Sequence, residues 1–409
     1  MKARSRFCLV FASIACAMCG LFAAALYAVY FSQQPGQDWM VYYTAARAAL
    51  DGNLALLFDG DRLTAYMNVY FADWLKRPLT FHPWLYPPHT LFFLAPFGFL
   101  SFTASYVLFE LLTFGGLVAA LWTIAERGWQ RWLQFFSLLL APTASFTLGL
   151  GQNAFLSTAC LVGGFGLIGR SPTLAGVLLG LLTFKPQLWL MVPVALIAAR
   201  EWRVLGATMA TACIVTLASV AAFGIEPWRV WIEWVVNPPA EAYQNYQTWN
   251  HLADESVYTN LFLVHAPAAF AKFGQIAAGL LAICCVWWSY RRERSDQLQL
   301  VALLAATTLA APHVANYDMV MLSVAATVLF ASGLARNAGW IALAVPPLVW
   351  IMQLFNPPGA FAIGVVTPLL TCALIACAMV RIASSPGRVE RSGGSGGTAT
   401  RKSVAGATP

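Results

Sequence analysis

The chain has 409 residues, of which 59% are hydrophobic and only 10% are charged, and its mean hydropathy is +0.67. A soluble protein carries roughly 25% charged residues, so this composition excludes a soluble globular domain and indicates an all-α, polytopic integral membrane protein. The net charge of +7 does not indicate nucleic-acid binding, because most basic residues lie in short loops between apolar segments. The nine cysteines all lie in apolar segments without metal-ligand spacing to histidine, so we interpret them as helix-packing residues without disulfides.

Apolar segments close to the span length of about 20 residues recur from end to end. The first, 7–31, is too long for the apolar region of a signal peptide, and no convincing cleavage site follows it, so we expect a retained helix. The candidate spans are 7–31, 101–125, 132–149, 153–169, 173–184, 187–199, 203–223, 274–290, 298–311, 317–333, 339–354 and 360–381.

Basic residues lie before the first candidate span and after every second one. By the positive-inside rule, this alternation predicts about twelve spans, with a range of 10–13, and both termini in the cytoplasm. Residues 1–383 form the predicted membrane domain, and residues 384–409, rich in Gly, Ser and Thr, a disordered cytoplasmic tail. Short loops and a small tail indicate a bacterial inner (plasma) membrane. The basic residues are Lys2, Arg4, Arg6, Arg127, Arg131, Arg170, Arg200, Arg203, Arg291, Arg292, Arg294, Arg336 and Arg381.

Two long loops, 32–89 and 224–273, are predicted on the extracytoplasmic side, and both are rich in Trp and Tyr. Such aromatic residues favour the headgroup level of a bilayer. Within these loops, the runs Tyr42 to Leu50 and Glu226 to Val236 are typical of helices that lie on the outer leaflet. The apolar run 90–100 is too short to span and suits a re-entrant or interfacial piece.

Asp38 directly follows the first span, where a carboxylate is wet enough to stay ionised and close enough to lipid to meet a lipid-borne substrate. A catalytic base and a simple helix cap both fit this position. Arg47 is expected to pair with Asp51 on the helix that follows. Glu110 lies in the middle of the second span and should face the bundle interior or a cavity; its sequence context indicates no role.

Polar residues gather at turns that the predicted topology places on the same side as Asp38. Lys185 precedes Pro186 at a break between two short spans, where it suits a lipid-borne phosphate, although a lysine snorkelling from a helix end fits too. His313 suits a phosphate or sugar hydroxyl, or a helix cap. Gln152 and Asn153 suit sugar hydroxyls but are also ordinary turn residues. One histidine and one aspartate with no second histidine nearby argue against a metal site.

These motifs, in this order, resemble glycosyltransferase family 87 within the GT-C class of polytopic sugar transferases. The resemblance covers roughly residues 35–330 and rests on Asp38 with Tyr42-Tyr43, Tyr86-Pro87-Pro88, Gly151-Gln152-Asn153, Lys185-Pro186-Gln187, and Pro312-His313 with Tyr317-Asp318. It implies a polyprenyl-phosphate-sugar donor, mannose by family, a glycan or lipid acceptor, and transfer on the extracytoplasmic face. It also implies Asp38 as the base, and no metal or other cofactor. Trp39 follows Asp38, so a tandem acidic pair is absent.

The hypothesis is a single displacement with inversion, in which Asp38 accepts a proton from the acceptor hydroxyl. Lys185 and His313 are the candidates for stabilising the departing phosphate. The candidate substrate-binding residues are Tyr42, Tyr43, Tyr86, His89, Gln152, Asn153, Gln187, Tyr317 and Asp318. The alternatives are a secondary transporter, another lipid-linked glycan ligase or polymerase, and a non-catalytic assembly partner. Oligomeric state is not readable from the sequence.

Overall fold

The computed structural model describes residues 35–79, 81–124, 141–237, 254–292, 295–331 and 366–384, together with Phe135 and Leu138. Regular secondary structure in this part is helical apart from one isolated antiparallel bridge, Asp254 to Ala315, in agreement with the predicted all-α class. The predicted spans 7–31 and 339–354, most of the beginning of the span 132–149 (residues 132–140), and the tail beyond Ser384 lie outside the described residues.

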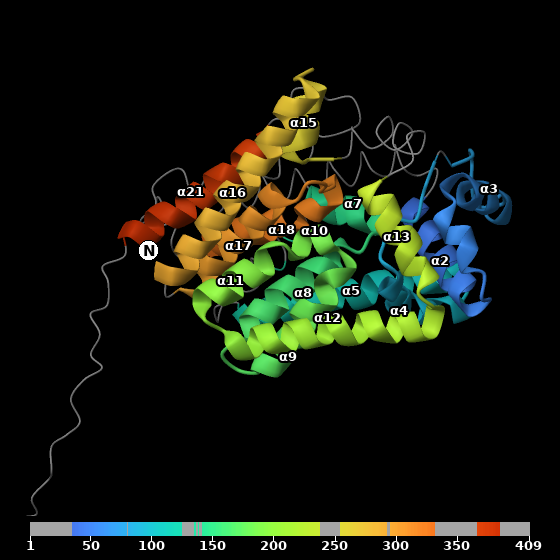
Figure 1. Cartoon of the computed structure of the whole chain (residues 1–409), viewed down its shortest axis with the longest axis horizontal. Coiled ribbons are helices and arrows are strands. Elements are labelled where there is room, and N and C mark those ends of the chain that lie inside the picture. The colour runs from blue at the N-terminus through green and yellow to red at the C-terminus, as the bar shows by residue number, and fades with distance from the viewer. Residues whose placement is uncertain are drawn as a thin grey trace, which may run out of the picture.

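The helices run as a bundle with the first long loop folded at one end (Figure 1). In chain order they are α2 (Gln37–Leu50), η1 (Leu54–Phe58), α3 (Gly60–Tyr70), η2 (Pro88–Thr90), α4 (Leu91–Leu94), η3 (Ala95–Phe99), α5 (Phe102–Ile124), α7 (Pro142–Leu150), α8 (Ala154–Leu167), α9 (Pro172–Leu181), η4 (Leu182–Phe184), α10 (Pro186–Trp189), α11 (Met191–Ala199), α12 (Trp202–Phe223), α13 (Glu226–Val236), α15 (Val257–Leu263), α16 (Ala268–Arg292), α17 (Asp296–Ala310), η5 (Asn316–Met319), α18 (Val320–Ala331) and α21 (Val366–Ser384).

Three of the described helices, α5, α12 and α16, are long and apolar enough to cross a membrane. The other predicted spans that fall within the described residues are shorter apolar helices, such as α8 and α17. The chain is thus a multi-pass membrane protein, while the count of twelve spans and the side on which each terminus lies stay predictions. The run 90–100 is not a span but two short helical pieces, α4 and η3.

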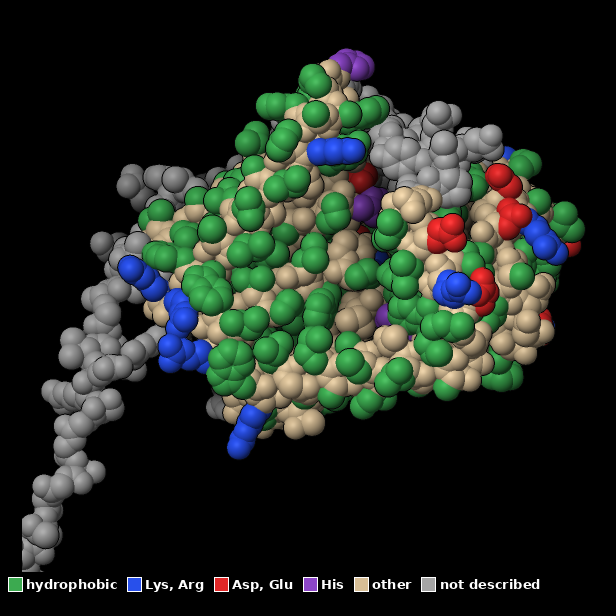
Figure 2. All heavy atoms as spheres, in the orientation of Figure 1, with side chains coloured by type: hydrophobic (Ala, Val, Ile, Leu, Met, Phe, Trp, Pro, Cys, Tyr) green, Lys and Arg blue, Asp and Glu red, His purple; other side chains and the backbone are tan. Residues whose placement is uncertain are grey.

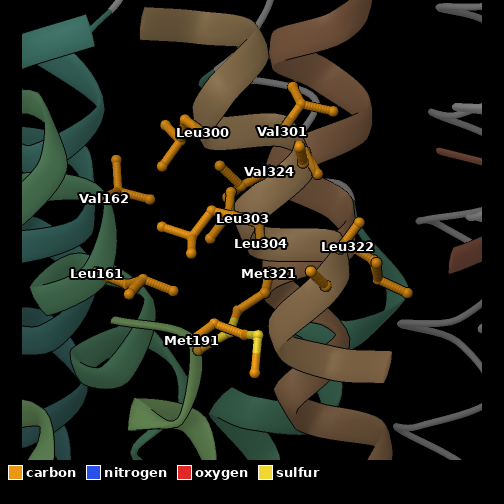
Figure 3. Close-up of a cluster of buried hydrophobic side chains, with 14 of the residues drawn as sticks. Leu161, Val162, Met191, Leu300, Val301, Leu303, Leu304, Met321, Leu322 and Val324 are labelled. Carbon is orange, nitrogen blue, oxygen red and sulfur yellow. The ribbon is translucent and has the colours of Figure 1, made fainter. Parts of the chain in front are cut away.

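The centre of the bundle is the pair α17 and α18. Every residue of α17 from Leu300 to Ala310 is buried, which is what a helix that is apolar all round requires. Figure 3 shows side chains of α17 and α18 meeting Leu161 and Val162 of α8 and Met191 of α11. The short helix η5 leads into α18, and the short helix α10 leads into α11. The core therefore fixes the positions of η5 and α10.

The helix predicted over Tyr42 to Leu50 exists as α2, but its predicted position on the outer leaflet is wrong. Trp39, Met40, Ala45 and Ala46 have no exposed surface, because α2 packs between η3, α4 and α5. Its apolar residues surround the helix instead of forming one stripe, and such a helix must be covered by protein. The expected ion pair between Arg47 and Asp51 is present at 3.7 Å.

The helix predicted over Glu226 to Val236 is confirmed as α13, and it does keep an exposed apolar face. Ile232 is 51% exposed and Val236 is 66% exposed, whereas Trp231 on another face donates a hydrogen bond to the backbone oxygen of Leu85. α13 therefore covers the first long loop with one side and presents apolar surface with the other, as an interfacial helix would.

Candidate functional site

A cavity of about 630 Å³ opens where α2, α13, the η4–α10 break and the segments around 254–259 and 312–318 meet. Figure 2 shows this region as a hollow between α15 and α13, with histidine, acidic and basic side chains visible inside it. Nine of the twelve sequence-predicted site residues line the cavity. They are Asp38, Tyr42, Tyr86, Gln152, Lys185, Gln187, His313, Tyr317 and Asp318.

Asp38 lies in the first turn of α2, and its side chain does not cap the helix. The N-cap is Gly36, and no side chain accepts a hydrogen bond there. Instead, Asp38 Oδ2 accepts a hydrogen bond of 2.8 Å from Gln152 Nε2. Burial raises the pKa of Asp38, and this effect outweighs the opposing influence of His82, the Gln152 hydrogen bond and Lys185. A raised pKa makes the carboxylate a stronger proton acceptor once it is ionised.

The position of Asp38 depends on a close approach between α2 and the turn that joins α7 to α8. The Gly36 N–H donates to the Gly149 oxygen at 2.7 Å. Gly151 has a φ of +76°, and a Cβ added to it would lie 2.5 Å from the Cβ of Trp39. Only glycine satisfies both the left-handed backbone and the contact distance, so this turn sets where Asp38 meets Gln152.

Asp38 and four neighbouring polar side chains form a hydrogen-bonded group, which we call the Asp38 cluster: Asp38, Tyr42, Tyr86, Gln152 and Asn153. Tyr42 Oη donates to Gln152 Oε1 at 2.7 Å, and Asn153 Nδ2 donates to Tyr42 Oη at 3.0 Å. The hydroxyls of Tyr42 and Tyr86 lie 2.6 Å apart. Asn153 does not line the cavity, so the expected direct contact between Asn153 and a sugar is not supported.

Lys185 lies at the helix break that its sequence context predicts, between η4 and α10, with Pro186 in the first turn of α10. It does not snorkel. Lys185 Nζ donates to Asp318 Oδ1 at 2.6 Å, and both side chains are only 3% exposed. The ammonium also lies 5.1 Å from the centre of the Tyr317 ring. The pairing with Asp318 balances the charge of a lysine that would otherwise be costly to bury.

His313 is paired with Asp254, a residue that the sequence interpretation missed. His313 Nδ1 and Asp254 Oδ2 lie 2.6 Å apart. Asp254 Oδ1 accepts from the backbone N–H groups of Ser256 at 2.8 Å and Val314 at 3.3 Å. With Lys185 and Asp318, these two residues form what we call the Lys185 cluster. The sequence signal for Asp254 is its place in the polar run Asp254-Glu255-Ser256 within the second long loop.

The Asp254–His313 contact shifts both groups toward their charged forms. Burial lowers the pKa of His313, but the charge and hydrogen bond of Asp254 outweigh it, and the net shift is upward. Burial raises the pKa of Asp254, but the charge and hydrogen bond of His313, together with the backbone donors, bring it below its usual value. The dyad therefore favours the imidazolium form of His313 at the cavity wall.

Two further predicted residues point away from the cavity. Tyr43 donates to the Leu100 oxygen at 2.9 Å and packs edge-on against Phe102, on a different side of α2 from Tyr42. His89 is buried and stacks on Trp228, with ring centres 5.5 Å apart. Burial lowers its pKa to about 4, so this imidazole is neutral at physiological pH. Direct substrate contacts by Tyr43 and His89 are not supported.

The cavity also contains residues to which the sequence assigned no place in the site. His82 comes from the first long loop, Trp231 and Trp234 from α13, and Tyr258 from α15. The tryptophans were recognised as part of an aromatic-rich loop, but their sequence context does not say which of them faces inward.

A comparison with protein families gives a match. The model of glycosyltransferase family 87 matches residues 84–314, a segment that contains Lys185, Asp254 and His313 and leaves Asp38 and Asp318 outside it. No curated protein and no solved structure matches the chain.

Proposed function

We propose a function for this chain from the premise that it belongs to glycosyltransferase family 87, whose model matches more than half of its residues. It is therefore a glycosyltransferase, embedded in a membrane by its apolar helices. Family membership favours sugar transfer over the transporter alternative, which would not need this family's sequence pattern.

The specific reaction that we propose is transfer of a hexose from a polyprenyl-phosphate-sugar donor to a glycan or lipid acceptor on the extracytoplasmic face, within a GT-C-like fold. Mannose is the sugar that the family resemblance favours. The proposal is supported by a single cavity that holds a partly exposed carboxylate, Asp38, and two basic side chains, the buried Lys185 and the partly exposed His313. A proton acceptor and cations are the two kinds of group that displacement of a phosphate by a hydroxyl requires.

In the proposed mechanism, Asp38 accepts the proton of the acceptor hydroxyl as that oxygen attacks the anomeric carbon. The new bond joins the acceptor oxygen to the anomeric carbon, and the bond from that carbon to the phosphate oxygen breaks. The lipid phosphate leaves with the electron pair. One displacement inverts the anomeric configuration, so a β-linked donor gives an α-glycoside.

Lys185 and His313 are proposed to stabilise the charge that grows on the departing phosphate. Each already has a carboxylate partner, Asp318 at 2.6 Å and Asp254 at 2.6 Å. The phosphate would therefore bind beside existing ion pairs instead of meeting free cations. The cations then need no rearrangement from a solvated state, and electrostatic preorganisation of this kind is a large contribution to catalysis.

The experiment is transfer of radiolabelled sugar from polyprenyl-phosphate-mannose in membranes that contain equal amounts of wild type, Asp38→Asn or Asp51→Asn, with a chelator present. Loss of a general base typically costs about 10²–10⁴-fold in rate, so Asp38→Asn should lose nearly all transfer. Asp51→Asn is the matched control, because Asp51 pairs with Arg47 on the exposed end of α2. Full transfer by Asp38→Asn would contradict the assignment of the base, and loss of wild-type transfer with the chelator would contradict the absence of a metal requirement.

A further inference from the structure

We propose that Tyr42 is a positioning residue for Asp38: its hydroxyl holds the Gln152 amide in the one orientation that donates a hydrogen bond to the carboxylate. This inference rests on the proposed function, because it gives the proposed base its orienting partner. It replaces the expectation that Tyr42 and Gln152 act by touching the sugar.

The direction of each hydrogen bond in the Asp38 cluster follows from a count of protons. An ionised carboxylate only accepts, so Gln152 must turn its NH₂ group toward Asp38 Oδ2, 2.8 Å away. The amide oxygen of Gln152 then faces the other way and needs a donor. Tyr42 Oη donates to that oxygen at 2.7 Å and is the closer of its two donors, since the backbone N–H of Asn153 donates to it at 3.3 Å.

Tyr42 has a single hydroxyl proton, and the bond to Gln152 uses it. The other neighbours of its oxygen must therefore donate to it. Asn153 Nδ2 at 3.0 Å does so, and the Tyr86 hydroxyl at 2.6 Å takes the donor role by the same count. Each hydrogen bond in this chain is therefore donated in the direction of Asp38. Tyr42 has no proton left to donate to a sugar hydroxyl.

Burial and ring contacts hold Tyr42 in this arrangement. Tyr42 lies one helical turn after Asp38 on α2, and its side chain is only 2% exposed. Its ring meets Trp39 at 6.0 Å and Tyr86 at 5.4 Å between centres. Gln152 and Asn153 directly follow Gly151, the glycine on which α2 docks. The contact between α2 and Gly151 therefore positions both the base, Asp38, and the amide that donates to it, Gln152.

The consequence is a change in the pH at which the base is protonated. The charged or titratable groups that act on Asp38 or are acted on by it are His82, Lys185, Tyr42 and Tyr106. The Gln152 hydrogen bond lowers the pKa of Asp38 against the upward effect of burial. When Tyr42 no longer holds the amide, Gln152 can turn its oxygen toward Asp38, which favours the protonated acid. As the pH is lowered, activity is then lost at a higher pH than in the wild type.

The test is the acid limb of the pH–rate profile for wild type, Tyr42→Phe, Gln152→Leu and the double variant, in detergent-purified full-length protein with the labelled donor. A hydrogen bond to a charged group corresponds to about 1–2 pH units, so both single variants should move the acid limb upward by about one unit. Because Tyr42 acts through Gln152, the double variant should move it no further than Gln152→Leu alone. Tyr43→Phe is the matched control and should leave the limb in place, since Tyr43 bonds to the Leu100 oxygen outside the cavity.

An unmoved limb in Tyr42→Phe, or shifts that add in the double variant, would overturn the inference. If Tyr42→Phe does not accumulate in the membrane, Gln152→Leu decides alone, and an unmoved limb in that variant is the overturning result. These outcomes are distinct from failure of the proposed function, which appears as full activity in Asp38→Asn at every pH.

Discussion

The Asp38 cluster and the Lys185 cluster hold their charges in different ways. Asp38 is hydrogen-bonded by a neutral amide, which is itself held by neutral hydroxyl and amide groups. Lys185 and His313 are each bonded to a carboxylate. A carboxylate with neutral donors keeps its capacity to accept a proton, whereas a buried cation with its own counter-ion is tolerated before any substrate arrives. One cavity thus combines a carboxylate that can still accept a proton, Asp38, with two basic side chains that already have carboxylate partners, Lys185 and His313.

The sharpest way to break this comparison is to remove one member of the buried ion pair. Lys185→Met leaves the Asp318 carboxylate 3% exposed and without the ammonium that balances it. Breaking a buried pair in this way costs roughly 3–5 kcal/mol, so we expect a large fall in the thermal unfolding midpoint in detergent and no transfer. In Lys185→Met/Asp318→Asn, much of the stability should return without the activity. Recovery of transfer in the double variant would exclude Lys185 from phosphate binding.

The next largest effect concerns the contact that positions the Asp38 cluster. Gly151→Ala places a Cβ 2.5 Å from the Cβ of Trp39 and should push α2 away from Gln152. Overpacking of this kind costs about 1–3 kcal/mol, and a misplacement of about 1 Å costs about 100-fold in rate. Gly52→Ala is the matched control: Gly52 also has a positive φ, +70°, but its added Cβ meets nothing within 4 Å. Equal activities in the two variants would mean that the Trp39 contact does not position the base.

The Asp254–His313 dyad predicts an alkaline limit. The folded-state pKa of His313 is raised, so the stability that the dyad contributes is present below the unfolded pKa of histidine and is lost as pH rises through the raised value. The pKa of Asp254 is lowered, so its contribution is lost only as pH falls through that depressed value.

Asp254→Asn should move the alkaline limb of the pH–rate profile to lower pH by about one unit. An alkaline limb that stays in place would show that the imidazolium is not needed for transfer.

The smallest effect is expected outside both clusters. The Arg47 and Asp51 side chains are 44% and 59% exposed and 3.7 Å apart. Exposed pairs of this kind contribute about 0.3–0.5 kcal/mol or less, so Asp51→Ala should change the unfolding midpoint little and leave the initial rate of transfer unchanged. A large loss of transfer would mean that the end of α2, and not only its beginning, takes part in the site.

Much of the site could be located from the sequence because its residues stand at breaks in apolar segments. The turn at Gly151, the break at Pro186 and the turn after Pro312 are all recognisable as places where a helix must end. The adjacent pair Tyr42 and Tyr43 shows where this reasoning stops. Both follow Asp38 on α2, yet only Tyr42 lines the cavity, because neighbouring helical residues point about 100° apart and packing decides which side faces inward.

By itself, the sequence determined that the chain is helical and embedded in a membrane, that α2 and α13 are helices, and that polar residues stand where spans are interrupted. These properties depend on local composition and backbone preference. Only the tertiary structure decided which charges meet. Lys185 pairs with Asp318 across 133 residues, Tyr42 bonds to Gln152 across 110, and His313 finds Asp254 across 59. Such pairings depend on how α17 and α18 hold the turns around them and on the close approach at Gly151, and no short stretch of sequence contains that information.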